Sequence, residues 1–350
     1  MMSRRLFAIA SLPAFVLSFA ILSLAMLALA GCGGGSGGSG SDAADGVAPA
    51  ATRVRLQLNW VPEPEFGGIY AAELNGYFRE EGLEVEIVKG GPGVAAPQLA
   101  AAGKVEFAVV GGEQILTLRE QGGDLVGLFA IFQEDPMAVM VHAESPHATL
   151  ADLWRSNATL ACESNLSWVR MLERRLGKGG VRIVPHTGSL AEFAADKGRA
   201  QQCFVFAEPV ALELQGIPTR VFLASESGFL AYNVVVATAE AYAAAHPETC
   251  ERLVRALQRG WRGYLDDPSV TNAHMASLNT AMSREAMDLG AKRQASLVIG
   301  TDTEALGLGA MTVERWAAMR DALRELGTIG GETGAEPARL FRWAAPRADS

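Results

Sequence analysis

The sequence has little cysteine and little histidine, and neither residue is arranged as a metal or redox site requires. Its four cysteines include no C-x-x-C pair, and its five histidines have no cysteine or carboxylate partner at metal-ligand spacing. The metalloprotease motif H-E-x-x-H and the phosphate-binding P-loop are absent as well. The sequence therefore predicts no metal site, no cofactor and no catalytic residue, and it favours a protein that is not an enzyme.

Clustered basic residues are also missing. The chain has 30 lysines and arginines against 39 aspartates and glutamates, which gives a formal net charge of -9. Because contacts to phosphate need clustered lysine and arginine, we expect no nucleic-acid partner. The composition, 49% hydrophobic and 20% charged, is typical of a globular protein.

The longest apolar run lies at the N-terminus. Arg4 and Arg5 precede residues 6–30, and the run ends in Leu-Ala-Gly-Cys at 29–32. A basic start, an apolar middle and small residues at the end are typical of an export signal, although the run is also long enough for a membrane anchor. The last four residues resemble the bacterial lipobox, which implies cleavage before Cys32 and a lipid on that cysteine.

The expected product is a lipoprotein anchored in the cell envelope, on its periplasmic or extracytoplasmic face. Residues 1–31 would form the signal peptide. Residues 32–52 are mostly glycine, serine and alanine, a composition that predicts a flexible tether.

Three cysteines remain after Cys32, namely Cys162, Cys203 and Cys250. An odd number cannot form a closed set of disulfides. Cys162 and Cys203 lie near the ends of predicted strands, so a bridge between them stays open, but buried free thiols are the favoured interpretation.

Segments with strand and helix patterns alternate from residue 53 onward. Val54, Leu56 and Leu58 alternate with polar residues, as in a strand, and the residues that follow have helical spacing. The further predicted strands are 83–88, 105–111, 125–132, 137–142, 158–162, 181–186, 203–207 and 234–238. This alternation predicts an α/β fold with parallel-type sheets flanked by helices.

The strand and helix pattern restarts after residue 132 and finishes in helices, which predicts two lobes. We expect residues 53–135 and 235–330 to form a discontinuous first lobe, with the C-terminal helices packed on it. Residues 136–234 would form the second lobe, and 331–350 an irregular tail.

Candidate binding residues lie where predicted strands end and helices begin, the position at which open α/β sheets bind ligands. Trp60 could stack on a flat ring, and Tyr70 could form a second wall or donate its hydroxyl, but both could equally be core aromatics. The residues singled out at these junctions are Trp60, Glu65, Tyr70, Gly112, Glu113, Gln133, Glu163, Ser164, Asn165 and Glu208.

Three of the predicted helix starts carry a glutamate: Glu113, Glu163 and Glu208. A helix N-terminus attracts anions, so a carboxylate already placed there competes with an anionic ligand. The alternative is that these glutamates only cap their helices. Three acids in three places favour a cationic or N–H-rich ligand over an oxyanion.

The residues at these junctions, taken in their order along the chain, resemble the sequence pattern of a known protein family. The chain from about residue 54 to 326 is similar to the periplasmic solute-binding proteins of ABC importers, in the branch that includes thiamine-pyrimidine-precursor and alkanesulfonate binders. The residues that carry the resemblance are Trp60, Pro62, Gly68, Tyr70, Gly76-Tyr77-Phe78, Glu81-Gly82-Leu83, Gly103-Lys104, Arg119, Gly122, the segment AIFQ at 130–133, Glu208-Pro209, Gly216 and RGWRGYLDDP at 259–268.

The resemblance implies a two-lobed type II periplasmic-binding-protein fold that closes on its ligand about hinges near 134–141 and 229–236. It implies a monomer that delivers a small molecule to the permease and ATPase subunits of a transporter. It also implies that an aromatic residue stacks on the ring, which supports Trp60, and that the pocket is lined at Gly112-Glu113, Gln133, 163–165 and Glu208. Our hypothesis is that Glu113 or Glu208 accepts from an amino group and that Gln133 with Asn165 supplies amide hydrogen bonds.

The sequence departs from the pyrimidine binders after the tryptophan. Glu63-Pro64-Glu65-Phe66 stands where those proteins have an Asn/Thr/His-rich segment, and Glu163-Ser164-Asn165 replaces a glycine-rich loop. A related heterocycle, such as a riboflavin-like one, therefore joins the pyrimidine precursors as the expected ligand. The alternatives are an alkanesulfonate, taurine or nitrate-type anion and a pyrimidine-synthase-like enzyme of the same fold.

Overall fold

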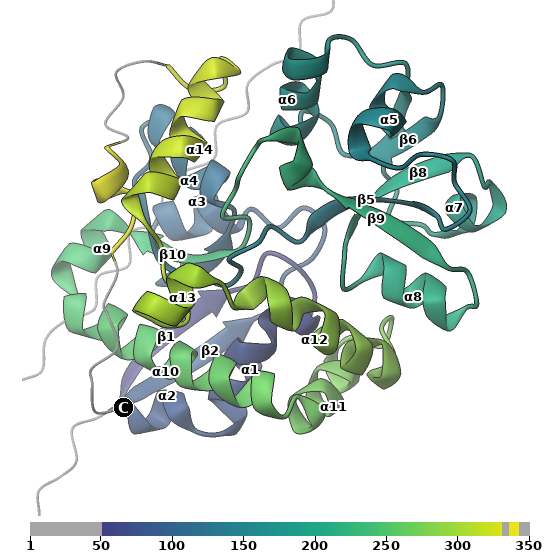
Figure 1. Cartoon of the computed structure of the whole chain (residues 1–350). Coiled ribbons are helices and arrows are strands. Elements are labelled where there is room, and N and C mark those ends of the chain that lie inside the picture. Colours follow the sequence, from purple (N-terminus) through teal and green to yellow (C-terminus); the bar gives the residue numbers. More distant parts are fainter. Residues whose placement is uncertain (1–50, 331–335, 343–350) are drawn as a thin grey trace, which may run out of the picture. The chain divides into compact units, whose positions relative to one another are not determined.

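The structure is a computed structural model that describes residues 51–330 and 336–342 (Figure 1). The predicted signal peptide 1–31, the predicted lipidation site Cys32 and nearly all of the tether 32–52 lie outside the described residues. Within the described part of the chain, every helix is too short or too polar to cross a membrane.

Sheet A has five strands in the order β2-β1-β3-β10-β4. In β1, Val54 and Leu56 are buried whereas Arg53 and Arg55 are exposed, which explains its clear alternation. β1 is parallel to β2 and β3, and β10 runs antiparallel between β3 and β4. The strands are β1 (Thr52–Gln57), β2 (Leu83–Val88), β3 (Phe107–Val110), β4 (Leu125–Ala130) and β10 (Val235–Ala239).

Sheet B has the matching order β7-β6-β8-β5-β9. β6 is parallel to β7 and β8, and β5 runs antiparallel between β8 and β9. The strands are β5 (Met137–His142), β6 (Thr159–Cys162), β7 (Arg182–Pro185), β8 (Arg199–Phe204) and β9 (Thr219–Leu223).

The predicted α/β architecture is confirmed, and the structure refines it in one respect, because both sheets are mixed. The antiparallel strand in each sheet, β10 or β5, is the one that arrives from the other sheet. The chain passes from β4 of sheet A into β5 of sheet B, and from β9 of sheet B back into β10 of sheet A. Each of these two strands therefore runs opposite to its neighbours in the sheet that it joins.

Helices cover both sheets (Figure 1). Glycine permits the closest contact, between α1 and α10, because a Cβ atom on Gly68 would lie 2.2 Å from Cγ of Trp261. The helices between strands of sheet A are α1 (Gly67–Leu74), α2 (Tyr77–Glu80), α3 (Ala96–Ala101) and α4 (Gly112–Glu120). Those of sheet B are α5 (Leu150–Arg155), α6 (Ser167–Leu176), α7 (Ala191–Ala195) and α8 (Glu208–Leu214).

The chain after β10 is helical. Trp261 of α10 meets Phe132 edge-on with ring centroids 6.4 Å apart, so this part of the chain packs beside sheet A. The helices are α9 (Glu240–Ala245), α10 (Pro247–Asp266), α11 (Ser269–Leu278), α12 (Arg284–Val298), α13 (Thr301–Leu306) and α14 (Val313–Glu325). Short 3-10 turns are η1 (Pro64–Phe66), η2 (Ala224–Ser227) and η3 (Pro337–Arg339).

The end of the described chain pairs with the edge of sheet A. Gly127 of β4 donates its N–H to the carbonyl of Leu340 at 2.9 Å and accepts from the N–H of Arg342 at 2.8 Å. Phe341 between them stacks on Trp316 with ring centroids 6.4 Å apart. Part of the predicted irregular tail thus forms a short bridge along β4.

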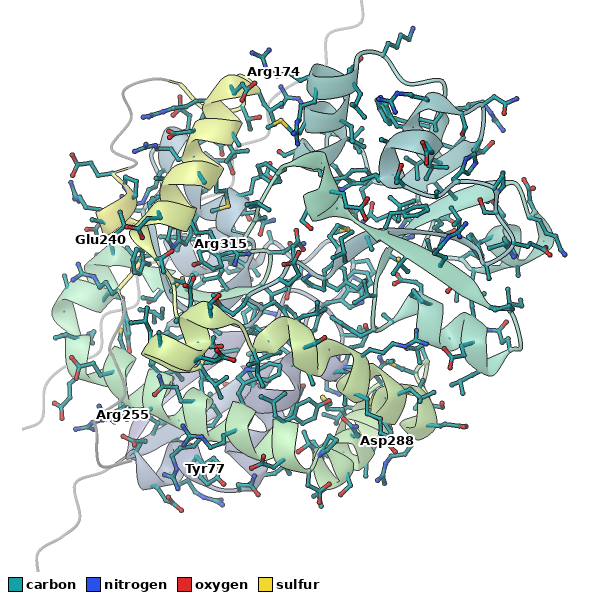
Figure 2. All side chains as sticks on the ribbon, in the orientation of Figure 1. Tyr77, Arg174, Glu240, Arg255, Asp288 and Arg315 are labelled. Atoms are coloured by element: carbon teal, nitrogen blue, oxygen red, sulfur yellow. The ribbon has the colours of Figure 1, made fainter. Side chains whose placement is uncertain are left out.

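Two connections join the sheets, and one set of side chains holds both. Asp135, in the first connection, accepts hydrogen bonds from the Met137 N–H and from Nδ2 of Asn233 in the second, each at 2.9 Å. Arg315 of α14 donates to the carbonyls of Gln133 and of Ala231, one from each connection (Figure 2). Burial raises the pKa of Asp135 to about 6.

Candidate functional site

The turn between β1 and α1 presents an aromatic ring to solvent. Trp60 is 40% exposed, so it is not a core residue, and its indole donates a hydrogen bond to Glu63. Tyr70 belongs to the core, 2% exposed, with its ring 5.7 Å from that of His274. The Tyr70 hydroxyl is buried without a hydrogen-bond partner among the described residues, so the predicted roles of both aromatics in ligand binding stay predictions.

Three glutamates near Trp60 act on one another electrostatically. Glu63 and Glu65 come from the turn at η1, and Glu208 is the first residue of α8 after β8. Glu65 is only 2% exposed. We call Glu63, Glu65 and Glu208 the acid group.

The acid group resists ionisation. Burial, and then the charges of Glu63 and Glu208, hold the pKa of Glu65 well above its ordinary value. Burial and Glu208 raise the pKa of Glu63 to about 8, against the opposing hydrogen bond from Trp60. Burial also raises the pKa of Glu208, although the Phe204 N–H donates to its Oε2 at 2.8 Å. At neutral pH the group therefore holds protons that separated glutamates would lose.

A helix distant in sequence supports the turn that carries two of these acids. Nε2 of Gln294 in α12 donates to the carbonyl of Pro64 at 2.7 Å, and Nδ2 of Asn279 donates to the carbonyl of Pro62 at 3.0 Å. Gly290 lets α12 approach, since a Cβ there would lie 2.7 Å from the carbonyl oxygen of Phe206. The two prolines fix the backbone φ, so the turn is held from within and from outside.

This arrangement suits a neutral or cationic ring. A protonated carboxyl offers an O–H donor beside a carbonyl acceptor, which matches the alternating donors and acceptors of a nitrogen heterocycle. A ring lying on the Trp60 indole would gain roughly 0.5–1.5 kcal/mol beyond its area burial. An anionic ligand would add charge to a group that already keeps its own protons.

The loop after β6 carries three of the predicted residues. Glu163, Ser164 and Asn165 are exposed, and Asn165 has a left-handed backbone with φ 63°, which asparagine tolerates. Gln202 positions Glu163, since its Oε1 accepts from the Glu163 N–H at 2.8 Å and its Nε2 donates to Oε2 at 3.3 Å. The charge of Glu163 in turn raises the pKa of Glu208.

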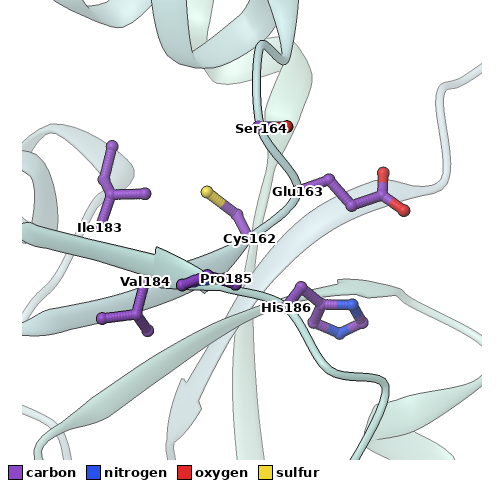
Figure 3. Close-up of a pocket in the computed structure, with 7 residues that line it drawn as sticks. All are labelled: Cys162, Glu163, Ser164, Ile183, Val184, Pro185 and His186. Carbon is purple, nitrogen blue, oxygen red and sulfur yellow. The ribbon is translucent and has the colours of Figure 1, made fainter. Parts of the chain in front are cut away.

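A pocket of about 610 Å³ opens beside this loop, at the carboxyl ends of β6 and β7 (Figure 3). We call it the β6–β7 pocket. Cys162 at its base is a buried free thiol, as is Cys203, so the two are not bridged. Burial raises the pKa of the Cys162 thiol to about 11, which keeps it uncharged. The lining residues are Cys162, Glu163, Ser164, Ile183, Val184, Pro185 and His186.

Three predicted residues have partners elsewhere. Oγ of Ser167, at the start of α6, donates to Oε1 of Glu113 at 2.5 Å, so this carboxyl joins two helix starts. The Gly112 N–H donates to the carbonyl of Tyr232 at 2.7 Å. Nε2 of Gln133 donates to the carbonyl of Ala310 at 3.0 Å. Glu65 and Glu163 are each linked to Glu208 electrostatically, whereas Glu113 and Gln133 make hydrogen bonds within the protein.

Two residues at the site were not among those singled out from the sequence. Glu63 completes the acid group, and Asn59 holds its Oδ1 buried without a described hydrogen-bond partner next to Trp60. Asn59 could have been found, because it is the polar residue directly at the end of the first strand. Among the described residues, no group of three or more histidine, cysteine or acidic side chains, the acid group included, is arranged so that it could hold a metal ion.

Comparison with known proteins places the chain in a family. The model of the NMT1/THI5-like family matches residues 63–271. The riboflavin-binding protein RibY of Chloroflexus aurantiacus is 27% identical over 308 residues, which cover 84% of this chain and 87% of that protein. The formylaminopyrimidine-binding protein of Halalkalibacterium halodurans is 31% identical over 104 residues, 30% of this chain and 32% of that protein.

The fold has solved counterparts. The periplasmic aliphatic sulphonate-binding protein SsuA of Escherichia coli superposes with a TM-score of 0.60 at 16% identity, over 87% of this chain and 96% of that one. At this identity the likeness concerns the fold alone. The chain therefore has the two-lobed type II fold of periplasmic binding proteins.

Proposed function

Because the chain belongs to the NMT1/THI5-like family, we propose that it is the solute-binding component of an ABC import system and captures a small nitrogen heterocycle. The ring would be riboflavin-like or pyrimidine-like, in keeping with the names of the two curated relatives. It would lie on Trp60 between the two sheets, and transporter subunits would receive it.

The single observation that carries this proposal is the burial of Glu65. The residue is 2% exposed, and Glu63 and Glu208 act on its carboxyl, whose pKa is held well above its ordinary value. A carboxyl that keeps its proton offers a donor and an acceptor to a ring that lies on the neighbouring exposed indole.

The same proposal includes the cell envelope and the lobes. An export signal and a lipid on Cys32 would hold the protein outside the cytoplasm, where a binding component must meet its solute. Residues 53–135 with 235–330 would form one lobe and 136–234 the other, and the connections that Asp135 and Asn233 join would serve as the hinge. The protein would act as a monomer.

An enzymatic role has less physical support. Cys162 and Cys203 are buried thiols whose pKa values are raised by burial, the reverse of what activates a nucleophile. An anion-binding role is disfavoured because the side chains whose charges act on Glu65 and Glu208 are acidic.

Calorimetry on the full chain tests the proposal with four ligands: riboflavin, an aminopyrimidine, an alkanesulfonate and nitrate. We expect Kd values from about micromolar to tens of nanomolar for a heterocycle and no binding of the anions. Trp60→Ala should weaken ring binding by roughly three- to tenfold, as expected for a lost stacking contact. Val270→Ala, which shortens an exposed apolar side chain of α11, is the control and should leave it unchanged.

Binding of the sulfonate or nitrate in preference to both heterocycles would overturn the proposed ligand class. Turnover of a bound heterocycle by the purified protein would overturn the non-enzymatic role. Binding that Trp60→Ala leaves intact would remove the indole from the site.

A further inference from the structure

We propose that the β6–β7 pocket is a second subsite, which holds an uncharged, hydroxylated tail of the heterocycle and rejects a phosphorylated one. This inference rests on the proposed function, because the ring must occupy the acid group for its tail to reach the pocket. The pocket volume of about 610 Å³ is within the range of roughly 300–1,000 Å³ found for small-molecule sites.

The pocket and the acid group share a border. β6, β7 and β8 are parallel, so their carboxyl ends lie at the same edge of sheet B. Glu163 follows β6 and lines the pocket, and Glu208 follows β8 and belongs to the acid group. Both glutamates are held by β8, because Gln202 of this strand hydrogen-bonds Glu163 and the Phe204 N–H, two residues further along, donates to Glu208. A ligand with a ring on Trp60 can therefore extend past Glu163.

The polar side of the pocket suits hydroxyl groups. Glu163 is an acceptor that Gln202 holds in place at 2.8 Å and 3.3 Å. Burial lowers the pKa of His186, so at neutral pH its imidazole is uncharged. Nε2 of Gln201 lies 3.4 Å from its Nε2, which leaves the N–H at Nδ1 as a donor for a ligand. Ser164 adds a hydroxyl. Figure 3 shows the Glu163 carboxylate and the His186 ring extending to the same side of the strands.

The remaining lining suits the carbon atoms of such a tail. Ile183 is 47% exposed in the edge strand β7, and Val184 and Pro185 lie beside it. The Cys162 thiol, uncharged at neutral pH, completes this apolar part. A chain of hydroxylated carbons has both kinds of surface, with C–H groups against the apolar residues and O–H groups towards Glu163 and His186.

The same lining opposes a phosphate. No lysine or arginine is among its seven residues, and Glu163 supplies a carboxylate. Arg199, whose charge acts on His186, has its own acidic partner, because its Nη2 lies 2.5 Å from Oε2 of Glu192. A phosphate beside Glu163 would lose water without gaining a cation, which is unfavourable.

Three flavins with the same ring separate the subsite from the ring site. Riboflavin has a hydroxylated tail, lumiflavin has a methyl group in its place, and flavin mononucleotide carries a phosphate on the tail. Titration of the full chain, followed by flavin fluorescence, should show riboflavin binding about tenfold more tightly than lumiflavin, the gain expected of one or two hydrogen bonds to a charged group. Flavin mononucleotide should bind at least about tenfold more weakly than riboflavin.

Two variants assign the effect to the pocket. Glu163→Gln keeps the side-chain shape and removes the charge, so it should narrow the gap between riboflavin and flavin mononucleotide and leave lumiflavin unchanged. His186→Ala should weaken riboflavin but not lumiflavin. Glu173→Gln, which removes an exposed acid from α6 outside the pocket, is the matched control and should preserve all three affinities.

Equal affinities for riboflavin and lumiflavin would overturn the subsite and leave the proposed function standing. If the protein binds an aminopyrimidine but none of the flavins, the subsite would likewise be overturned and the proposed function would stand. Flavin mononucleotide binding as tightly as riboflavin would overturn the rejection of phosphate. Failure of every heterocycle to bind would overturn the proposed function and the subsite together.

Discussion

The strands β1 and β6 occupy the same position in two sheets of identical order, yet the loops that follow them differ in almost every physical respect. After β1 comes a proline-rich turn with a buried glutamate, held by α12. After β6 comes an exposed loop with one left-handed asparagine and a single glutamine to position it. The contrast indicates that the sheet A side of the site is preformed and the sheet B side can adapt.

The edge strands next to β1 and β6 also differ in how well they are covered, and again the strand in sheet A is the more buried one. β2 pairs with all six residues of β1, and its Leu83 is fully buried. β7 pairs with the four residues of β6, and among its residues only Val184 is half-buried whereas the other three are exposed. The rigid sheet A side can fix the position of the ligand ring, whereas the less covered sheet B side can accommodate ligand tails of different length.

The largest effect is expected from a substitution that disturbs the packing of α1 on α10, which supports the sheet A side of the site. Gly68→Ala would place a Cβ atom 2.2 Å from Cγ of Trp261, and overpacking of this kind should lower the free energy of unfolding by about 2–3 kcal/mol. Gly198→Ala, exposed beside β8 with its nearest atom at 3.4 Å, should change it by less than about 0.5 kcal/mol. Denaturant unfolding of both variants measures the difference, and equal losses would contradict it.

The pH dependence of the stability of the protein tests the protonation of the acid group on the sheet A side. Since the pKa of Glu63 is about 8 in the folded chain against 4.5 ordinarily, the folded state keeps a proton that the unfolded state releases between those values. Stability should therefore fall as the pH rises from about 5 to 8, by on the order of 1–3 kcal/mol.

Glu63→Gln should flatten this decline in thermal-unfolding measurements, because the amide does not titrate. Glu173→Gln on the sheet B side should keep the slope of the unmodified protein. A decline of the same size in Glu63→Gln would show that other groups cause it.

The contact between the two sides offers a smaller effect. Ser167→Ala removes the donor to Glu113, and the loss should cost about 1–2 kcal/mol, with faster amide exchange at the starts of α4 and α6. Ser164→Ala in the exposed loop serves as the control. Unchanged exchange at both helix starts would mean that the hydrogen bond does not hold the sides together. A second contact remains, since Nε of Arg174 in α6 donates to Oε1 of Glu325 at 2.6 Å (Figure 2).

The smallest effect is expected at the edge of sheet B. Ile183→Thr replaces a side chain that is 47% exposed, so the free energy of unfolding should change by about 0.5 kcal/mol or less. A loss above about 1 kcal/mol would show that β7 is better covered than its exposure indicates, and would remove the contrast with β2.

Local patterns were enough to predict most elements of the fold. The alternation of Val54 and Leu56 with arginines marks β1, and apolar runs mark β4 and β5. The strand predicted at 203–207 begins four residues earlier, at Arg199, because the buried residues Gln201 and Gln202 give a polar sequence to the middle of β8. β9 was missed because Arg220 and Val221 form too short an alternation after Gly216.

The site was less predictable, because its geometry depends on contacts between distant residues. Trp60 and Glu208 were found at strand ends, but the turn that buries Glu65 is held by Gln294, which is 230 residues from its partner Pro64 in sequence. Glu113 resembled a ligand-binding acid, and only the approach of α6 shows that Ser167 occupies it. The residue types at the junctions between strands and helices can be predicted from sequence, whereas the interaction partner of each carboxyl can be identified only in the tertiary structure.

The short bridge between Gly127 and residues 340–342 has a practical consequence. β4 is the outermost strand of sheet A, and this segment satisfies both backbone groups of Gly127. Trimming the chain at residue 335 would open that strand to edge-to-edge pairing with another molecule, a common start of aggregation. A shortened protein for crystallisation should therefore keep Arg342.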